Sequence, residues 1–259
     1  MALQEELKQQ GDFLFRYRSY LPFALLPFFI LVIFTSDTFL LSENVIPGGG
    51  VIYNTPLIAT AIIIGMLGQG IRIWVAGFAP KDTSGRNTKE QKASVLNHTG
   101  LYSLCRNPLY LGNFLMMLAP CILLGNWLFI LVFVLSFWLY YERIIFAEEH
   151  FLRSKFGQEY IDWTLHTPPF FPKFTGYVPS KMDFSFRSML RREYHSFFGL
   201  TSSLFVFHYL IVVFVCWLND WHLLLPNEIL SYLFGISAVF YLLVRSLVKK
   251  TKLFEVADR

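Results

Sequence analysis

Long apolar segments are the feature that most limits what this chain can fold into. A helix that crosses a hydrocarbon core of ~30 Å needs about 20 predominantly apolar residues. Hydrophobic residues make up 54% of the chain and charged residues only 15%, which is far from the composition of an ordinary soluble domain. We therefore predict an all-α, polytopic membrane protein with about six transmembrane helices, at residues 20–41, 56–79, 108–124, 127–147, 197–218 and 226–247.

Short turn-forming segments indicate how these helices connect. Gly125 and Asn126 separate two apolar segments and favour a tight turn in a helical hairpin. Residues 167–172, Thr-Pro-Pro-Phe-Phe-Pro, cannot form regular helix and should lie along the membrane surface. We divide the chain into a two-span region (1–79), a core with a polar loop, the hairpin and a pair of glutamates (80–175), and an interfacial segment followed by two C-terminal spans (176–259).

The basic residues predict which side each loop faces. All 22 Lys and Arg residues fall at one end of the predicted spans, and none falls in segments 42–54, 125–126 or 219–225. Cytoplasmic loops carry an excess of Lys and Arg, so this separation predicts an even number of spans with both termini in the cytoplasm. Gly49 should then face the outside and Ser84 the cytoplasm.

Charge and cysteine placement argue against several other classes. The net charge of +4 is spread between apolar spans rather than gathered on one face, so nucleic-acid binding is not expected. Cys105, Cys121 and Cys216 are isolated, which predicts buried thiols with no disulfide and no metal site. Cys105 adjoins Arg106, and a reactive thiolate is the alternative there. Residues 1–19 contain no apolar core, so no cleaved signal is expected.

A polar loop that opens into an apolar helix is the strongest candidate for a site. Arg106, Asn107, Tyr110 and Asn113 would lie at or just below the membrane surface, where polar groups are costly unless they are satisfied or line a cavity. Pro108 suits the first turn of a helix, whose N-terminus can receive an anion, and Gly112 lets a partner approach the backbone closely.

Glu148 and Glu149, at the inner end of the fourth predicted span, lie on the same membrane face as this loop. Successive helical residues differ in direction by about 100°, so the two carboxylates should serve different partners. By themselves, such acids are more often solvated or bonded to a neighbour such as Arg153 or Lys155. Their combination with the Arg106 loop is what indicates a site.

Together these motifs resemble the integral-membrane methyltransferases typified by isoprenylcysteine carboxyl methyltransferase and phosphatidylethanolamine N-methyltransferase. The resemblance covers Gly-x-x-Ile-Arg-x-Trp at 68–74, Thr-Gly-Leu-Tyr at 99–102, Arg-Asn-Pro-Leu-Tyr-Leu-Gly at 106–112, and Glu-Glu-x-x-Leu-x-x-x-Phe-Gly-x-x-Tyr at 148–160. It implies S-adenosylmethionine as cofactor. The contacts that it implies or that adjoin its motif are His98, Gly100, Tyr102, Arg106, Pro108, Tyr110, Gly112, Asn113, Glu148 and Glu149.

The chemistry of the cofactor is compatible with these residue types. Its ammonium needs a carboxylate, and its carboxylate needs Arg, N–H or hydroxyl donors. Asn107 stands where the family often has histidine, and Asn cannot titrate near neutrality. Methyl transfer to an acceptor that is already anionic requires no base, and Arg143 could hold such an anion, although a topology anchor is an equal reading. The expected catalytic residues are Arg106, Arg143 and Glu148.

The sequence thus predicts a multi-pass enzyme of a bacterial inner membrane or endoplasmic reticulum type. Its site faces the cytoplasm, where methyl passes to a carboxylate or phosphate oxygen of a lipid or lipid-modified substrate. Methylation of a lipid phosphate, as in a related bacterial lipid A methyltransferase, also fits. Alternatives are a phospholipid amine N-methyltransferase, an NADPH-dependent sterol-reductase-like enzyme and a non-enzymatic transporter. The last two spans could shape lipid entry or form a dimer contact.

Overall fold

The structure is a computed structural model that describes residues 2–20, 26–35, 45–46, 50–51, 55–80, 93–218, 225, 227–254 and 256. Within these residues the fold is helical, apart from one antiparallel ladder of two-residue strands, so the predicted all-α class is confirmed. The elements are α1 (Leu3–Tyr17), η1 (Arg18–Tyr20), α3 (Leu26–Thr35), β1 (Val45–Ile46), β2 (Gly50–Val51), α5 (Thr55–Phe78), η2 (Gly100–Ser103), α6 (Pro108–Leu123), α7 (Trp127–Phe156), α8 (Gln158–His166), α9 (Phe186–Leu218) and α10 (Glu228–Lys250).

Four of the described helices, α5, α7, α9 and α10, are long and apolar enough to cross a membrane. Helix α6 is apolar but has only 16 residues, which gives a length of about 24 Å. Of the predicted first span, the structure describes a helix only at 26–35; residues 21–25 and 36–41 lie outside the described part. The count of six spans and the side on which the termini lie therefore stay predictions.

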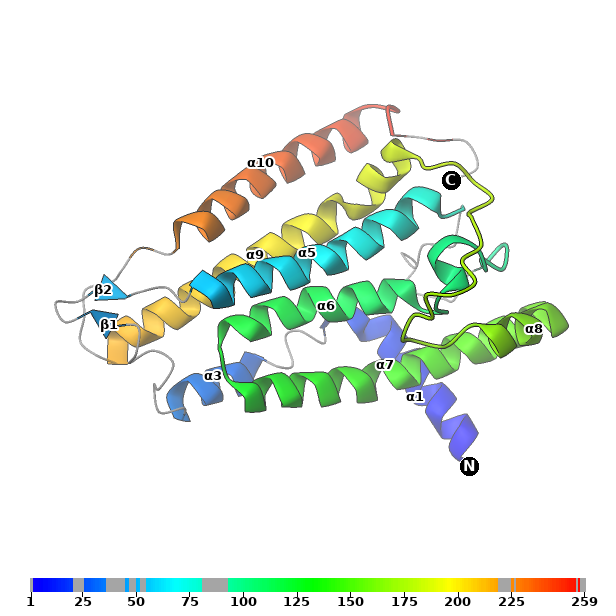
Figure 1. Cartoon of the computed structure of the whole chain (residues 1–259), viewed down its shortest axis with the longest axis horizontal. Coiled ribbons are helices and arrows are strands. Elements are labelled where there is room, and N and C mark those ends of the chain that lie inside the picture. The colour runs from blue at the N-terminus through cyan, green and yellow to red at the C-terminus, as the bar shows by residue number, and fades with distance from the viewer. Residues whose placement is uncertain are drawn as a thin grey trace.

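The helices form one bundle, whose layers can be followed in Figure 1. Helix α5 packs against α6 and α9, α6 packs against α7, and α10 covers α9. The amphipathic helix α1, which the sequence reading did not predict, packs across α7. Strands β1 and β2 lie at one end of the bundle, while α8 and the segment that joins it to α9 lie at the other.

Several predicted breaks are confirmed. Gly125 has a φ of 65° between α6 and α7, and the Asn126 side chain accepts a hydrogen bond from the Phe129 N–H to cap α7. Residues 167–172 contain no helix. Helix α7 is longer than the predicted span at 127–147, because it continues to Phe156, and Gly157 ends it with a φ of 56°. The Glu148–Glu149 pair therefore lies inside a helix.

Gly68 makes the close contact between α5 and α6. A Cβ at Gly68 would lie 2.6 Å from the Gly112 carbonyl oxygen and 2.9 Å from the Met116 backbone nitrogen. Backbone atoms cannot yield as the tip of a long side chain can. Gly70, on the same helix, has nothing within 4 Å of such a Cβ.

We expect Gly68→Ala to destabilise the protein by about 1–3 kcal/mol, because the added methyl group overpacks the α5–α6 contact. The matched variant Gly70→Ala should be neutral or stabilising by up to about 1 kcal/mol, since alanine is the better helix former and has free space there. Thermal unfolding in detergent measures both. Equal stability of the two variants would contradict this packing.

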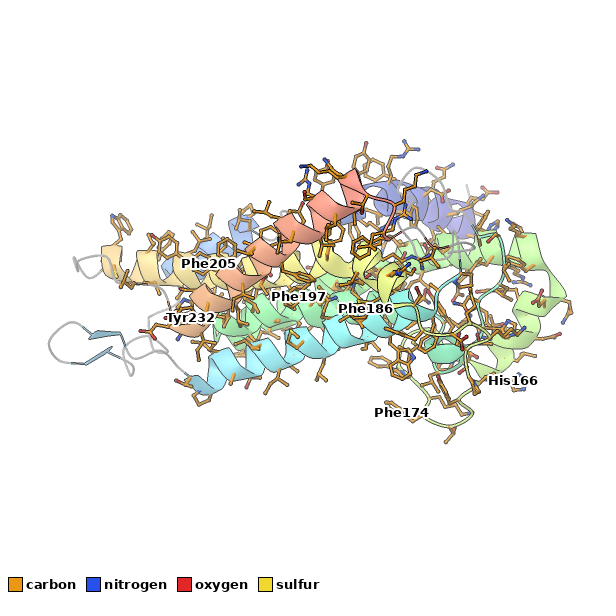
Figure 2. All side chains as sticks on the ribbon, turned by 90° about the horizontal axis from the view of Figure 1, so that it is seen from above. His166, Phe174, Phe186, Phe197, Phe205 and Tyr232 are labelled. Carbon is orange, nitrogen blue, oxygen red and sulfur yellow. The ribbon has the colours of Figure 1, made fainter. Side chains whose placement is uncertain are left out.

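The topology can be tested at two described and exposed positions, because Gly49 and Ser84 lie outside the described residues. Phe174, 85% exposed, belongs to the loop end of the bundle, whereas Leu225, 83% exposed, precedes α10 near its other end. Figure 2 shows Phe174 at the loop end and Tyr232 of α10 toward the opposite end. Since basic loops should be cytoplasmic, an impermeant thiol reagent added outside should label Leu225→Cys and spare Phe174→Cys. The reverse pattern would overturn the orientation.

Candidate active site

The loop before α6 is held in place by the proline-rich segment that follows α8. The Arg106 backbone N–H donates to the Pro168 carbonyl at 2.9 Å, and the Asn107 side-chain amide donates to the Pro169 carbonyl at 2.9 Å. Asn107 therefore has a role that an amide performs well and that requires no titration. Two further backbone hydrogen bonds join the same regions: Lys173 N to Leu104 O at 2.9 Å and Gly100 N to Val178 O at 2.8 Å.

Arg106 and Glu149 form an ion pair between this loop and α7. Arg106 Nη1 lies 3.0 Å from Glu149 Oε1, and the two side chains are 15% and 28% exposed. The Tyr160 hydroxyl of α8 lies beside both, and burial together with Glu149 raises its pKa, so it stays a neutral donor. Arg106 Nε has no hydrogen-bond partner among the described residues. A buried donor of this kind is available to a ligand.

The ion pair lies in the wall of a cavity of about 720 Å³, within the usual range of small-molecule sites. Helix α7 supplies half of the lining residues, α8 supplies three, and the loop before α6 and helix α1 supply one each. The lining residues are Gln4, Arg106, Phe146, Glu149, His150, Arg153, Ser154, Tyr160, Ile161 and Thr164.

Glu148 faces a different neighbour. Its carboxylate hydrogen-bonds with the Tyr110 hydroxyl of α6, whereas Glu149 pairs with Arg106. The ring of Tyr110 meets the ring of Tyr141 edge to face, with centroids 4.9 Å apart. The two adjacent carboxylates thus have different partners, as their spacing on a helix predicts.

Three other predicted residues lie in or next to η2. Gly100 has a φ of 63°, which a residue with a side chain adopts rarely. Burial and the nearby Glu148 raise the pKa of Tyr102, so its hydroxyl stays neutral and able to donate. His98 Nδ1 is buried, and within the described part of the chain it has no hydrogen-bond partner.

Pro108, Gly112 and Asn113 lie on α6, and their contacts are with protein. Pro108 is buried at the first position of the helix, as predicted. The close approach expected at Gly112 is made by Arg72 of α5, whose Cγ would lie 2.8 Å from an added Cβ. Asn113 Oδ1 accepts a hydrogen bond from Arg72 Nη1 at 2.5 Å. A ligand in the cavity would therefore contact Arg106 and Glu149 rather than these three residues.

Arg143 points toward α1. Its Nε donates to Gln10 Oε1 at 2.8 Å and its Nη1 donates to the Leu139 carbonyl at 2.7 Å, and it is not among the residues that line the cavity. A role in holding an acceptor would require the side chain to leave Gln10.

Arg18 is a charged neighbour of the site that the sequence reading assigned only to topology. Its positive charge acts on Glu148, Tyr110 and Tyr141. Its guanidinium lies over the ring of Phe15, 4.0 Å from the centroid. No local pattern marks Arg18, because its place depends on how α1 packs on α7.

The thiol of Cys105 is buried, as are those of Cys121 and Cys216, which agrees with the prediction of buried thiols. Desolvation raises its pKa to about 11, so the neighbouring Arg106 does not produce a thiolate near neutrality. Among the described residues no group of three or more His, Cys, Asp or Glu side chains could hold a metal ion.

Comparison with known proteins places this site in a family context. A family model described as phospholipid methyltransferase matches residues 58–159, which begin inside the first of the three predicted regions. The chain is 33% identical over 124 residues to the nickel-cobalt-cadmium resistance protein NccN of Alcaligenes xylosoxydans xylosoxydans, covering 46% of this chain and 54% of that protein. It is 35% identical over 127 residues to the cobalt-zinc-cadmium resistance protein CzcN of Cupriavidus metallidurans, covering 48% and 53%.

A third relative is the protein-S-isoprenylcysteine O-methyltransferase of Schizosaccharomyces pombe, 34% identical over 85 residues, which cover 33% of this chain and 36% of that protein. The chain thus spans about half the length, or less, of these relatives. No solved structure gives a significant match. The matched region contains the Arg106 loop, the α6–α7 hairpin and the glutamate pair. Residues 58–159 of this chain are therefore similar to phospholipid methyltransferases and, over a shorter stretch, to isoprenylcysteine methyltransferases.

Proposed function

We propose that this chain is an integral-membrane methyltransferase that moves a methyl group from S-adenosylmethionine to a carboxylate or phosphate oxygen of a lipid or lipid-modified substrate. The observation that carries the proposal is the Arg106–Glu149 ion pair in the wall of the 720 Å³ cavity. The family match over residues 58–159 supports the same reaction class.

The ion pair is complementary to an amino-acid group. Arg106 can exchange Glu149 for a ligand carboxylate, with its Nε as a further donor, while Glu149 receives the ligand ammonium. Tyr160 and Tyr102 stay neutral and can donate to oxygen. The residues present therefore fit the α-amino acid end of S-adenosylmethionine, which, when bound, supplies an electrophilic methyl group on a sulfonium.

Bound in this way, the cofactor would supply its methyl group to the acceptor oxygen, with the sulfur as the leaving atom. An ionised carboxylate or phosphate needs no base for this step. The charges of acceptor and sulfonium cancel as the bond forms, so a site that excludes water favours the reaction. In the orientation that the basic loops predict, the cavity opens to the cytoplasm and the lipid enters sideways from the bilayer.

Two titrations separate this proposal from its rivals. S-Adenosylmethionine should give a binding isotherm in calorimetry and NADPH should give none; the opposite result would favour a sterol-reductase-like enzyme. After incubation with isotopically labelled cofactor, mass spectrometry of membrane lipids should find the label on a phosphate or carboxylate ester. Label only on an amine headgroup would replace the anionic acceptor with N-methylation.

Arg18 is our preferred cation for the acceptor because its charge acts on the Tyr110–Glu148 side of the site. Both arginines make hydrogen bonds, Arg18 to the Phe15 carbonyl and Arg143 to Gln10 and the Leu139 carbonyl, so position rather than lack of partners distinguishes them. Arg18→Ala should raise the acceptor KM by about tenfold with little effect on cofactor affinity, since one charge-assisted contact is lost. Arg143→Ala should change KM less. A larger KM effect at Arg143 would restore the role that the sequence predicted for it.

Two relatives are named for metal resistance. Among the described residues, no cluster of metal ligands supports a corresponding proposal for this chain.

A further inference from the structure

A buried polar cluster joins α9 to α5 and α6, two of the helices in the matched region. Glu193 of α9 is 5% exposed, and its carboxylate receives two hydrogen bonds from Arg72 of α5: Nε to Oε2 at 2.8 Å and Nη2 to Oε1 at 3.0 Å. Ser196 accepts from Arg72 Nη2 at 3.1 Å, and Gln69 Nε2 donates to Glu193 Oε2 at 3.4 Å. Figure 1 shows α9 beside α5 and above α6.

The bidentate geometry fixes the Arg72 guanidinium and neutralises it. Two parallel N–H···O bonds set the plane of the guanidinium as well as its distance. Because its charge is matched by Glu193, Arg72 is poorly suited to bind an acceptor anion. One guanidinium nitrogen, Nη1, is not used in this pairing. It makes the fourth hydrogen bond of Arg72, to Asn113 of α6.

Asn113 connects this cluster to the site. It lies one turn after Tyr110 on α6, and Tyr110 hydrogen-bonds with Glu148. Asn113 also lies near the Tyr141 hydroxyl, and the ring of Tyr141 meets that of Tyr110. The close contact of Gly68 and Gly112 sets the distance between α5 and α6. A hydrogen bond at Asn113 can then fix the rotation of α6 about its axis and its position along that axis.

A cluster that only joined helices would not need to reach Asn113. Glu193 and Ser196 already satisfy one edge of the guanidinium and tie α9 to α5. The additional contact extends the ordered chain across a third helix, toward the one that carries Tyr110. Residue 193 lies outside residues 58–159, so the family model does not include the residue that begins this chain of hydrogen bonds.

We propose that Glu193 is a positioning residue of the methyltransferase site: it orients Arg72, which holds Asn113 and thereby fixes the Tyr110 face of α6 against Glu148. Helix α9 is, on this inference, part of the catalytic unit. The inference rests on the proposed function, because the effect expected of Glu193 is on the binding and turnover of S-adenosylmethionine.

The test compares Glu193→Gln and Glu193→Asp with Ser237→Ala in the full-length protein. Ser237 of α10 hydrogen-bonds with Thr201 of α9 at 2.6 Å, so its loss removes a buried hydrogen bond between α9 and another neighbour, α10, without touching Arg72. Calorimetry measures the Kd for S-adenosylmethionine, and thermal unfolding reports stability separately. Glu193→Gln should raise Kd by about tenfold, Glu193→Asp should rescue part of this, and Ser237→Ala should lower the unfolding temperature while leaving Kd at the wild-type value.

A double-mutant cycle with Asn113→Ala distinguishes positioning from packing. If Glu193 acts through Arg72 on Asn113, Asn113→Ala should weaken binding and Glu193→Gln should add little to it. If Glu193→Gln does not fold, Ser196→Ala removes one Arg72 contact and should show the same coupling on a smaller scale.

Each outcome has a definite reading. Wild-type Kd in folded Glu193→Gln, or additive effects in the cycle, would overturn the positioning role, while the proposed function would stand if Arg106→Ala still lost binding. Failure of the wild-type protein to bind S-adenosylmethionine would overturn both.

Discussion

Replacing Arg106 with alanine should weaken S-adenosylmethionine binding by about 10- to 150-fold, the equivalent of losing charge-assisted hydrogen bonds of about 1.5–3 kcal/mol. Arg106 lies at the start of α6, pairs with Glu149 and keeps its Nε free of hydrogen bonds to described residues. Its removal also leaves the half-buried Glu149 carboxylate without a positively charged partner. The Kd from calorimetry is the direct measurement.

Two controls sharpen this result. Arg106→Lys should recover only part of the affinity, because a single ammonium cannot reproduce the two-pronged donor geometry. Lys173→Ala removes an exposed cation from the segment that clamps the same loop and should leave Kd unchanged. Equal losses at Arg106 and Lys173 would indicate that net charge, rather than the specific pair, governs binding.

Glu149→Gln and Glu148→Gln should differ in effect, although the two residues are adjacent. Glu149 lines the cavity and faces Arg106, so the loss of its charge removes the partner for the cofactor ammonium. We expect a loss of affinity of about 10- to 150-fold for Glu149→Gln. Glu148 is bonded to the Tyr110 hydroxyl, and a glutamine amide can keep that hydrogen bond, so its affinity loss should be at most about tenfold.

Comparing the two glutamate variants tests directly which carboxylate binds the cofactor ammonium. Both changes remove one negative charge from the same turn of α7, so they differ only in position. Thermal unfolding should be measured in parallel. Equal and negligible losses would remove the pair from the site, and a larger loss at Glu148 would move the ammonium to the Tyr110 side.

The site includes contributions from both flanks of the matched region. Gln4 and Arg18 come from α1 and η1, and Glu193 comes from α9, while the family match covers residues 58–159. A shorter variant that retained only the matched core would therefore lose a wall of the cavity and the partner of Arg72.

The sequence by itself determined the class of fold, and it pointed to the Arg106 loop and the Glu148–Glu149 pair as a candidate site. Apolar segments of about 20 residues have few alternatives to a membrane helix, and four of those predicted are long apolar helices in the structure. The turn at Gly125 and the irregular segment at 167–172 were readable because glycine and proline act on their own backbone. The Arg106 loop and the Glu149 helix were both recognised from local motifs.

Only the tertiary structure decided which charged groups meet. The predicted anion holder Arg143 turns to Gln10, the predicted ligand contact Asn113 turns to Arg72, and Arg18 approaches Glu148. Each of these depends on the rotation of one helix about its axis and on its crossing with another. Local periodicity specifies which face of a helix is apolar, but in a bilayer most faces are apolar, so sequence patterns leave those rotations open. Small residues at the contacts, such as Gly68 against Gly112, and buried polar pairs such as Arg72 and Glu193 set them instead.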